Sequence, residues 1–282
     1  AILFPVFAQA KDAAKKTQSL SNIKNLATGV MVYLPDYDDT IPMSEYDAGA
    51  NYVSWATQIM PYVKNGDTMV TSSGRTITIG SDGIFRSPGV PAPGVRQRNN
   101  KEFSYGVHFS LFVTNYYESW AGYPGVTGNL NPGVNFNVVD APADKIMMME
   151  KGINDSGNQW NYPWFHDWQA MWVDSICTVS GDPSTVYRDG VDIYTPGSGV
   201  YTPYFDNDCP TTFGGGWECA ASARYRFTKV SPMAFMDGHA KGMKKGEIKW
   251  FKNIWVDRRN LNRYSWFYDY QNDGGWGFPG IH

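Results

Sequence analysis

AILFPVFAQAKDAAKKTQSLSNIKNLATGVMVYLPDYDDTIP, residues 1–42, is the stretch that decides the fold of this chain. Its apolar side chains recur every three or four positions at Leu20, Ile23, Leu26, Ala27, Val30 and Leu34. This spacing places them on one stripe of an α-helix. Asp36, Asp38 and Pro42 then supply stop signals. We therefore predict one long helix over about residues 2–34, with this stripe packed on a core.

The start of this helix is apolar on every side, with Ile2, Leu3, Phe4, Val6 and Phe7 close together. Such a surface has to be covered by a bilayer, by a neighbouring subunit or by the chain's own core. We interpret these five side chains as an assembly interface that other copies of the same chain cover. Their burial would contribute about 7–15 kcal/mol before the entropic costs of association.

Three further segments resemble a known family in the same way as residues 1–42. They are FSYGVHFS (103–110), PADKIMMMEKG (142–152) and RYRFTKVSPMAFMDGHAKGMKKGEI (224–248). Together the four segments resemble a bacterial family of large type IV pilin-like proteins, which carry a prepilin-type N-terminal cleavage/methylation domain. The resemblance implies that 103–110 is a strand, that 142–152 contains a buried central strand and that 224–248 is a C-terminal Asp-Gly signature.

One position of that signature departs from the family. The family usually has a His, nine further residues and then Asp-Gly. Asp237 and Gly238 match this pattern, but Phe227 stands where the His is expected. A role that depends on that His is therefore not transferred to this chain.

The resemblance implies an α+β, pilin-like fold in which the long N-terminal helix packs on an antiparallel sheet with loop-rich and aromatic-rich insertions. We divide the chain into a helix, 1–35, and a globular β-rich domain, 36–282, with a variable insertion at about 153–223 that lies outside the resemblance. Local patterns add a helix over 51–63, a hairpin within 67–85, strands near 103–116 and 145–150, two strands within 224–240, and a short helix or strand over 246–256.

Composition favours a folded, exported protein. Aromatic residues make up 16% and charged residues 18% of the chain, whereas disordered chains have few aromatics and high net charge. No apolar stretch reaches the length of about 20 residues that a bilayer requires. We therefore expect no membrane span in the chain as given, the spanning half having been cut off or lying before it. The expected location is extracellular or on the cell surface.

Charge is distributed unevenly along the chain. Residues 1–35 carry four lysines against Asp12, and residues 241–263 carry eight Lys and Arg residues against two acidic ones. Because the net charge is −3, the remainder is strongly acidic. Opposite-sign regions suit head-to-tail contacts between copies, although a solvated face is the commoner explanation. No nucleic-acid motif accompanies the basic residues, so we expect self-association and no nucleic-acid partner.

Three cysteines occur, Cys177, Cys209 and Cys219. Cys209 and Cys219 flank a turn-rich loop whose ends can approach disulfide distance. In an exported protein we pair those two, and a bond from Cys177 to either of them is the competing arrangement.

Calcium is the only cofactor that the sequence suggests. Asp36, Asp38 and Asp39 follow the predicted helix, and Ca²⁺ takes six to eight oxygen ligands from flexible loops. Solvated turns or a helix cap explain the same three carboxylates.

Motifs for catalysis are weak. Asp237 and His239 form an isolated pair, which is more often a hydrogen-bonded turn than the centre of a metal hydrolase. We therefore predict a protein that is not an enzyme: a structural subunit that self-assembles into an extracellular filament, tube or pseudopilus through its apolar helix start. The alternative is a surface carbohydrate- or ligand-binding module that uses exposed tryptophans, Trp160, Trp164, Trp168 and Trp172, unless their spacing places them in a core.

Overall fold

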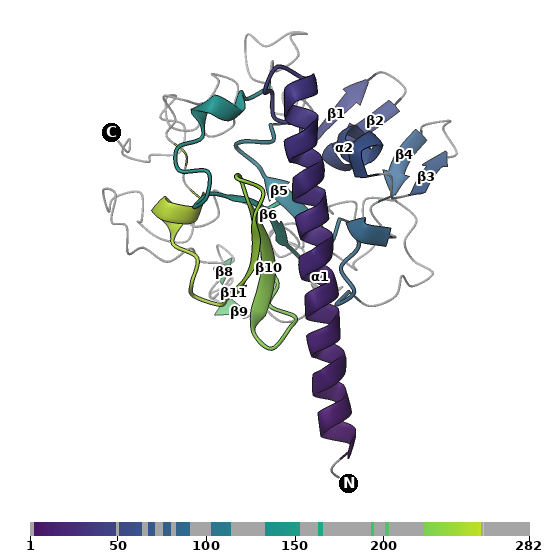
Figure 1. The fold of residues 1–282 in the computed structure, drawn as a ribbon, viewed down its shortest axis with the longest axis vertical. Helices are drawn as coiled ribbons and strands as arrows, with labels where there is room; N and C mark the ends of the chain where they lie inside the picture. Colours follow the sequence, from purple (N-terminus) through teal and green to yellow (C-terminus); the bar gives the residue numbers. More distant parts are fainter. Residues whose placement is uncertain are drawn as a thin grey trace.

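A computed structural model describes residues 3–48, 51–63, 67–70, 76–79, 83–90, 103–113, 133–152, 163–165, 193–194, 201–202, 223–254 and 256. In these residues one long helix, α1 (Leu3–Asp36), crosses a five-stranded sheet and extends beyond it at the N-terminal end (Figure 1). The described residues thus form an α+β protein with an N-terminal helix and a mixed sheet.

The predicted long helix and its apolar stripe are confirmed. The buried side chains of α1 are Ser19, Asn22, Ile23, Leu26, Ala27, Val30, Tyr33 and Leu34. They follow one another at three- and four-residue intervals, which is the spacing of one face of an α-helix. Leu20, also predicted for the stripe, is half-buried at its edge.

The main sheet has the strand order β11-β10-β6-β5-β7. Its strands are β5 (Tyr105–His108), β6 (Ile146–Glu150), β7 (Trp164–Phe165), β10 (Val230–Phe235) and β11 (Ala240–Lys244). All neighbours are antiparallel except β5 and β7, which are parallel, so the expectation of a purely antiparallel sheet is wrong. A parallel neighbour needs a long connection, and the chain between β5 and β7, which includes β6, supplies one.

A smaller unit packs beside α1. It contains the hairpin β1 (Glu45–Ala48) and β2 (Asn51–Ser54), the helix α2 (Trp55–Val63), and the predicted hairpin β3 (Asp67–Val70) and β4 (Thr76–Ile79). The prediction of a helix from residue 51 is wrong for its first four residues, which pair with β1. The helix begins after Ser54, because the Ser54 hydroxyl accepts the backbone N–H of Thr57 at 3.4 Å as an N-cap.

Several shorter elements complete the described residues. Two short strands, β8 (Ile193–Tyr194) and β9 (Tyr201–Thr202), pair within the predicted insertion. Single helical turns occur at Gly83–Phe85 and Phe136–Val138, and a π-helix occupies Trp250–Ile254, where a short helix or strand was expected.

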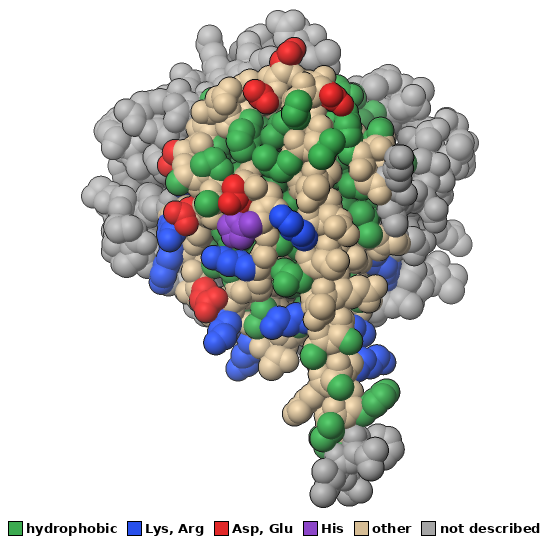
Figure 2. Space-filling view, viewed as in Figure 1, with side chains coloured by type: hydrophobic (Ala, Val, Ile, Leu, Met, Phe, Trp, Pro, Cys, Tyr) green, Lys and Arg blue, Asp and Glu red, His purple; other side chains and the backbone are tan. Residues whose placement is uncertain are grey.

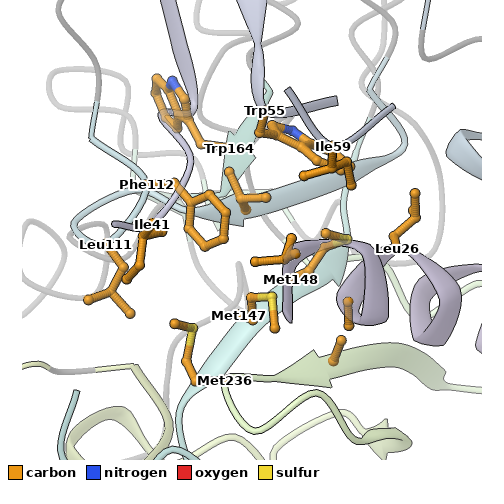
Figure 3. Close-up of a cluster of buried hydrophobic side chains, with 14 of the residues drawn as sticks. Leu26, Ile41, Trp55, Ile59, Leu111, Phe112, Met147, Met148, Trp164 and Met236 are labelled. Atoms are coloured by element: carbon orange, nitrogen blue, oxygen red, sulfur yellow. The ribbon is translucent and has the colours of Figure 1, made fainter. Parts of the chain in front are cut away.

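The core lies on both faces of the sheet. Figure 3 shows side chains of α1, α2 and β6 converging, among them Leu26, Ile59 and Met148. Met149, the next residue of β6, points to a second cluster on the opposite face with Phe235. Because both faces are covered, all five residues of β6 are buried, which explains why its first four residues form an uninterrupted apolar run.

The turn between β10 and β11 lies against α1. Gly238 has φ +84°, a left-handed conformation that glycine adopts without strain, as predicted for the Asp-Gly turn. Lys24 of α1 donates from Nζ to the Gly238 carbonyl at 2.6 Å. A Cβ at Gly238 would stand 3.0 Å from Cγ of Met31. This close approach joins the hairpin to the middle of the helix.

Candidate assembly surface

The N-terminal part of α1 is not covered by the described residues. Every side chain from Pro5 to Ala14 is exposed, and the first buried one is Ser19. Val6 is 59% and Phe7 is 71% exposed. Of the other predicted interface residues, Leu3 and Phe4 belong to the helix by their backbone, and Ile2 lies outside the described residues. The structure therefore presents an apolar tip on a helix that projects from the globular part (Figure 1).

A buried polar network holds α1 where it meets the sheet. The Ser19 hydroxyl donates to Oε2 of Glu150 at 3.0 Å and lies 2.8 Å from the hydroxyl of Tyr105. Glu150 also accepts hydrogen bonds at Oε1 from the Ser87 hydroxyl and from Nη1 of Arg226, both at 2.8 Å. The network thus connects the helix, β5 and β6 at one point and fixes the position of α1 on the sheet.

Burial dominates the electrostatics of this network. It raises the pKa of the fully buried Glu150 carboxyl, while the Arg226 guanidinium and the Ser87 and Ser19 hydroxyls act in the opposite direction. Burial also raises the pKa of Tyr105, and the nearby Glu150 adds to this effect. No motif in the sequence predicts this network. Its only local signal is Glu150 directly after an apolar run, a position where a charge needs partners.

The C-terminal end of α1 carries a second exposed surface. Val32 is 52% and Tyr37 is 49% exposed. The Tyr37 ring stacks on Tyr33 with centroids 3.9 Å apart. Tyr62 of α2 donates its hydroxyl to Oδ2 of Asp36 at 2.8 Å, and this hydrogen bond is the main reason that the pKa of Tyr62 is raised to about 12. Aromatic rings and carboxylates therefore lie together here.

The three aspartates predicted to bind calcium belong to the turn that ends α1. Asp38 and Asp39 have φ values of 50° and 57°, and the N–H of Asp39 donates to the Leu34 carbonyl at 2.9 Å. Left-handed residues that return a hydrogen bond to the last turn are a common way to end a helix, and Asp tolerates this conformation. The described residues, which include Asp36, contain no group of three or more His, Cys, Asp or Glu side chains placed to hold a metal ion.

On the side of the molecule that carries α1, positive and negative side chains are separated along the helix direction. Figure 2 shows described Lys and Arg side chains around the level where α1 leaves the globular part, whereas the uppermost charged side chains are acidic. Lys16 contributes to the basic level by lying over β11, with its Cε 3.7 Å from the place of a Cβ on Gly242. This surface is therefore basic toward the N-terminal end of α1 and acidic toward its C-terminal end.

Asp237 and His239 have a local structural role. The backbone N–H and the Nδ1 atom of His239 contact Oδ1 of Asp237 at 3.0 and 2.5 Å. Partial burial favours a higher pKa for Asp237, but the contacts with His239 and the charge of Lys24 outweigh it and lower that pKa. The His239 ring stacks on Phe235 at 4.3 Å. These contacts close the hairpin turn. Phe227, at the position of the family's His, is a buried apolar side chain.

The structure bears on one of the four tryptophans that the alternative function requires. Trp164 lies in β7, is 3% exposed and belongs to the main core, so its use as an exposed platform is wrong. Trp160, Trp168 and Trp172 lie outside the described residues. The three cysteines, with the predicted Cys209–Cys219 pair, also lie outside them.

The described residues define the class of this protein as α+β, with a helix that projects from a mixed sheet. Comparisons with protein-family models, with curated proteins and with solved structures find no match. None of the described helices combines the length and the apolar character that crossing a membrane demands.

Proposed function

We propose that this protein is a non-enzymatic structural subunit that self-assembles into an extracellular filament, tube or pseudopilus. The observation that carries the proposal is the projecting part of α1, where Val6 and Phe7 are 59% and 71% exposed. Large apolar side chains in this position are costly for an isolated soluble protein, and a second subunit is a natural cover for them.

The way in which α1 is held supports this function. Its second half is fixed by the buried stripe and by the Ser19–Glu150 network, so the tip is presented in a defined direction. Covering Val6 and Phe7 would contribute about 1.5–3 kcal/mol for each side chain before the costs of association. Because association costs on the order of 4–15 kcal/mol, these two side chains are not sufficient alone, and the proposal requires further contacts between copies.

The pilin-like classification and the extracellular location belong to the same proposal. They rest on the four sequence segments that resemble the pilin-like family and on the aromatic-rich composition. A helix that lies on a sheet and projects beyond it is compatible with that classification.

Charged substitution of the tip tests the proposed function. We expect Phe7→Asp to abolish polymers in negative-stain electron microscopy and in sedimentation, because a carboxylate cannot be buried unpaired in the contact. Thr17→Asp is the matched control, because Thr17 is an exposed residue of the same helix outside the apolar tip. Circular dichroism should report unchanged folding for both variants.

Two results would contradict the function. One is a Phe7→Asp protein that polymerises normally. The other is a wild-type protein that stays a single particle at all concentrations, and glycan binding by that particle would favour the carbohydrate-binding alternative.

A further inference from the structure

Among the described residues, the exposed large hydrophobic side chains occur at the two ends of one helix. Val6 and Phe7 lie near the start of α1, Val32 lies near its end, and Tyr37 directly follows it. The intervening part of α1 places its large apolar side chains against the core. Two separate apolar surfaces at opposite ends of a rod are what a head-to-tail contact between copies requires.

The charges beside the two surfaces are complementary. Lys11, which is exposed, stands one turn after Phe7, and Asp36, also exposed, stands one turn after Val32. Asp38 and Asp39 extend the acidic side at the helix end. On the side of α1 that carries Phe7 and Lys11 the N-terminal end is apolar and basic, while the exposed Asp12 lies about 140° from Phe7 around the helix. This side therefore matches the apolar, aromatic and acidic C-terminal end.

The apolar pair and the charged pair have the same spacing along α1. Phe7 and Val32 are 25 positions apart, and so are Lys11 and Asp36. Twenty-five residues of α-helix make about seven turns and about 38 Å, so the members of each pair lie on the same side of α1. A single displacement of a neighbouring copy along the helix can therefore bring Phe7 to Val32 and Lys11 to Asp36 at once.

We propose that the two ends of α1 form one interface between successive copies of this chain. The N-terminal end of one α1, with Phe7 and Lys11, lies against Val32 and Asp36 of the next copy. The two copies are related by a shift of about 38 Å along α1 and a turn of about half a revolution, which makes the shared side of both helices face each other.

The shift also separates the sheets of the two copies along the helix direction. The N-terminal end of α1 stands away from the other described elements, whereas its C-terminal end lies beside β1 and α2 (Figure 1). The shift of about 38 Å therefore places the sheet of the next copy past the C-terminal end of the first helix. The N-terminal end of each α1 then contacts one neighbour and its C-terminal end contacts another, so the contacts do not form a closed ring. Such a heterologous contact generates an open filament.

The inference rests on the proposed self-assembly, and a charge exchange tests it separately. We expect Lys11→Asp alone and Asp36→Lys alone each to lower the polymerised fraction at least about tenfold, because like charges then face each other. In an equimolar mixture of the two single variants, every contact between unlike variants pairs opposite charges, so the mixture should also polymerise, with the two variants alternating. The double variant Lys11→Asp/Asp36→Lys restores the match at every contact and should recover polymerisation.

Matched controls separate this contact from a general charge effect. Thr17→Asp and Thr28→Lys place the same new charges on exposed positions of α1 outside both ends, and should polymerise like the wild type. Image analysis of the double-variant filaments should give an axial shift between contacting copies of about 38 Å.

The outcomes distinguish the two proposals. Loss of polymers with Phe7→Asp, together with normal polymers in both single charge variants, would overturn the head-to-tail contact and leave the proposed function standing. Failure of the folded double variant to recover would also overturn the contact. A wild-type protein that never polymerises would overturn both.

Discussion

Residues 3–18 and 19–36 belong to one continuous helix, yet fully buried side chains occur only in the second half. In the first half Phe7 is 71% exposed, whereas in the second half Ile23 and Leu26 are completely buried. The helical backbone is the same in both halves, so the difference lies in what covers the side chains. The comparison separates a role of α1 that the structure shows, support of the fold, from the role that we propose for its exposed half, contact with other copies.

Truncation of apolar side chains in the two halves should separate these roles most clearly. We expect Ile23→Ala to lower the free energy of unfolding by about 2–5 kcal/mol, because it leaves a cavity in the core. Val6→Ala should change it by less than about 0.5 kcal/mol, as is usual for an exposed position. Urea unfolding of dilute protein measures both. Equal losses in the two variants would show that the tip supports the fold.

A polar contact, made by Ser19, marks the boundary between the exposed and the buried half of α1. Ser19→Ala removes a hydroxyl that serves both Glu150 and Tyr105, and both partners are buried. We expect a loss of about 1–3 kcal/mol, because Oε2 of Glu150 loses its hydrogen bond from Ser19 and stays buried. Thr17→Ala, two residues earlier and exposed, loses only a bond to the Ala13 carbonyl and is the control. Chemical denaturation that gave the same midpoint for both variants would contradict a structural role for the network.

The sequence predicted the packed half of α1 well because its signal is local. Ile23, Leu26 and Val30 show their burial by a period that the helix imposes, whatever they pack against. The Ser19–Glu150 contact joins residues 131 positions apart, and no local pattern contains it. The same limit explains the error for residues 51–54. Their strand depends on pairing with β1, while their apolar spacing continues into α2 and resembles a helix.

The candidate surface was predictable in part for a similar reason. An apolar tip can be read directly from the residues, and Val6 and Phe7 were named from them. The second exposed end, with Val32 and Tyr37, was not found, because an apolar residue near a helix end has the same local pattern whether the core covers it or not. Only the tertiary structure shows that these two side chains remain exposed.

Two glycines with the same backbone conformation test how the covered half of α1 meets the hairpin. Gly238 and Gly246 have φ values of 84° and 86°, but only a Cβ at Gly238 would contact α1. Alanine in a left-handed conformation costs about 1–2 kcal/mol, so we expect both variants to lose about this amount in thermal unfolding. Gly238→Ala should lose more, because its methyl group would stand 3.0 Å from Met31. Equal losses would mean that Met31 moves away freely.

The smallest expected effect concerns the same hairpin, beside the covered half of α1. Because the pKa of Asp237 is lowered in the folded state, its carboxylate stabilises the fold above the unfolded pKa of about 3.9, and this contribution is lost as pH falls through the folded value. The side chain is 38% exposed, so water screens the interaction and the contribution should be below about 0.5 kcal/mol. Asp237→Asn keeps an acceptor for the N–H of His239 and removes the charge. We expect its free energy of unfolding to fall less steeply than that of the wild type between about pH 4 and pH 2, in parallel urea titrations. A steeper fall in the variant would mean that the folded state favours the protonated carboxyl, and that the contacts with His239 and Lys24 do not outweigh burial.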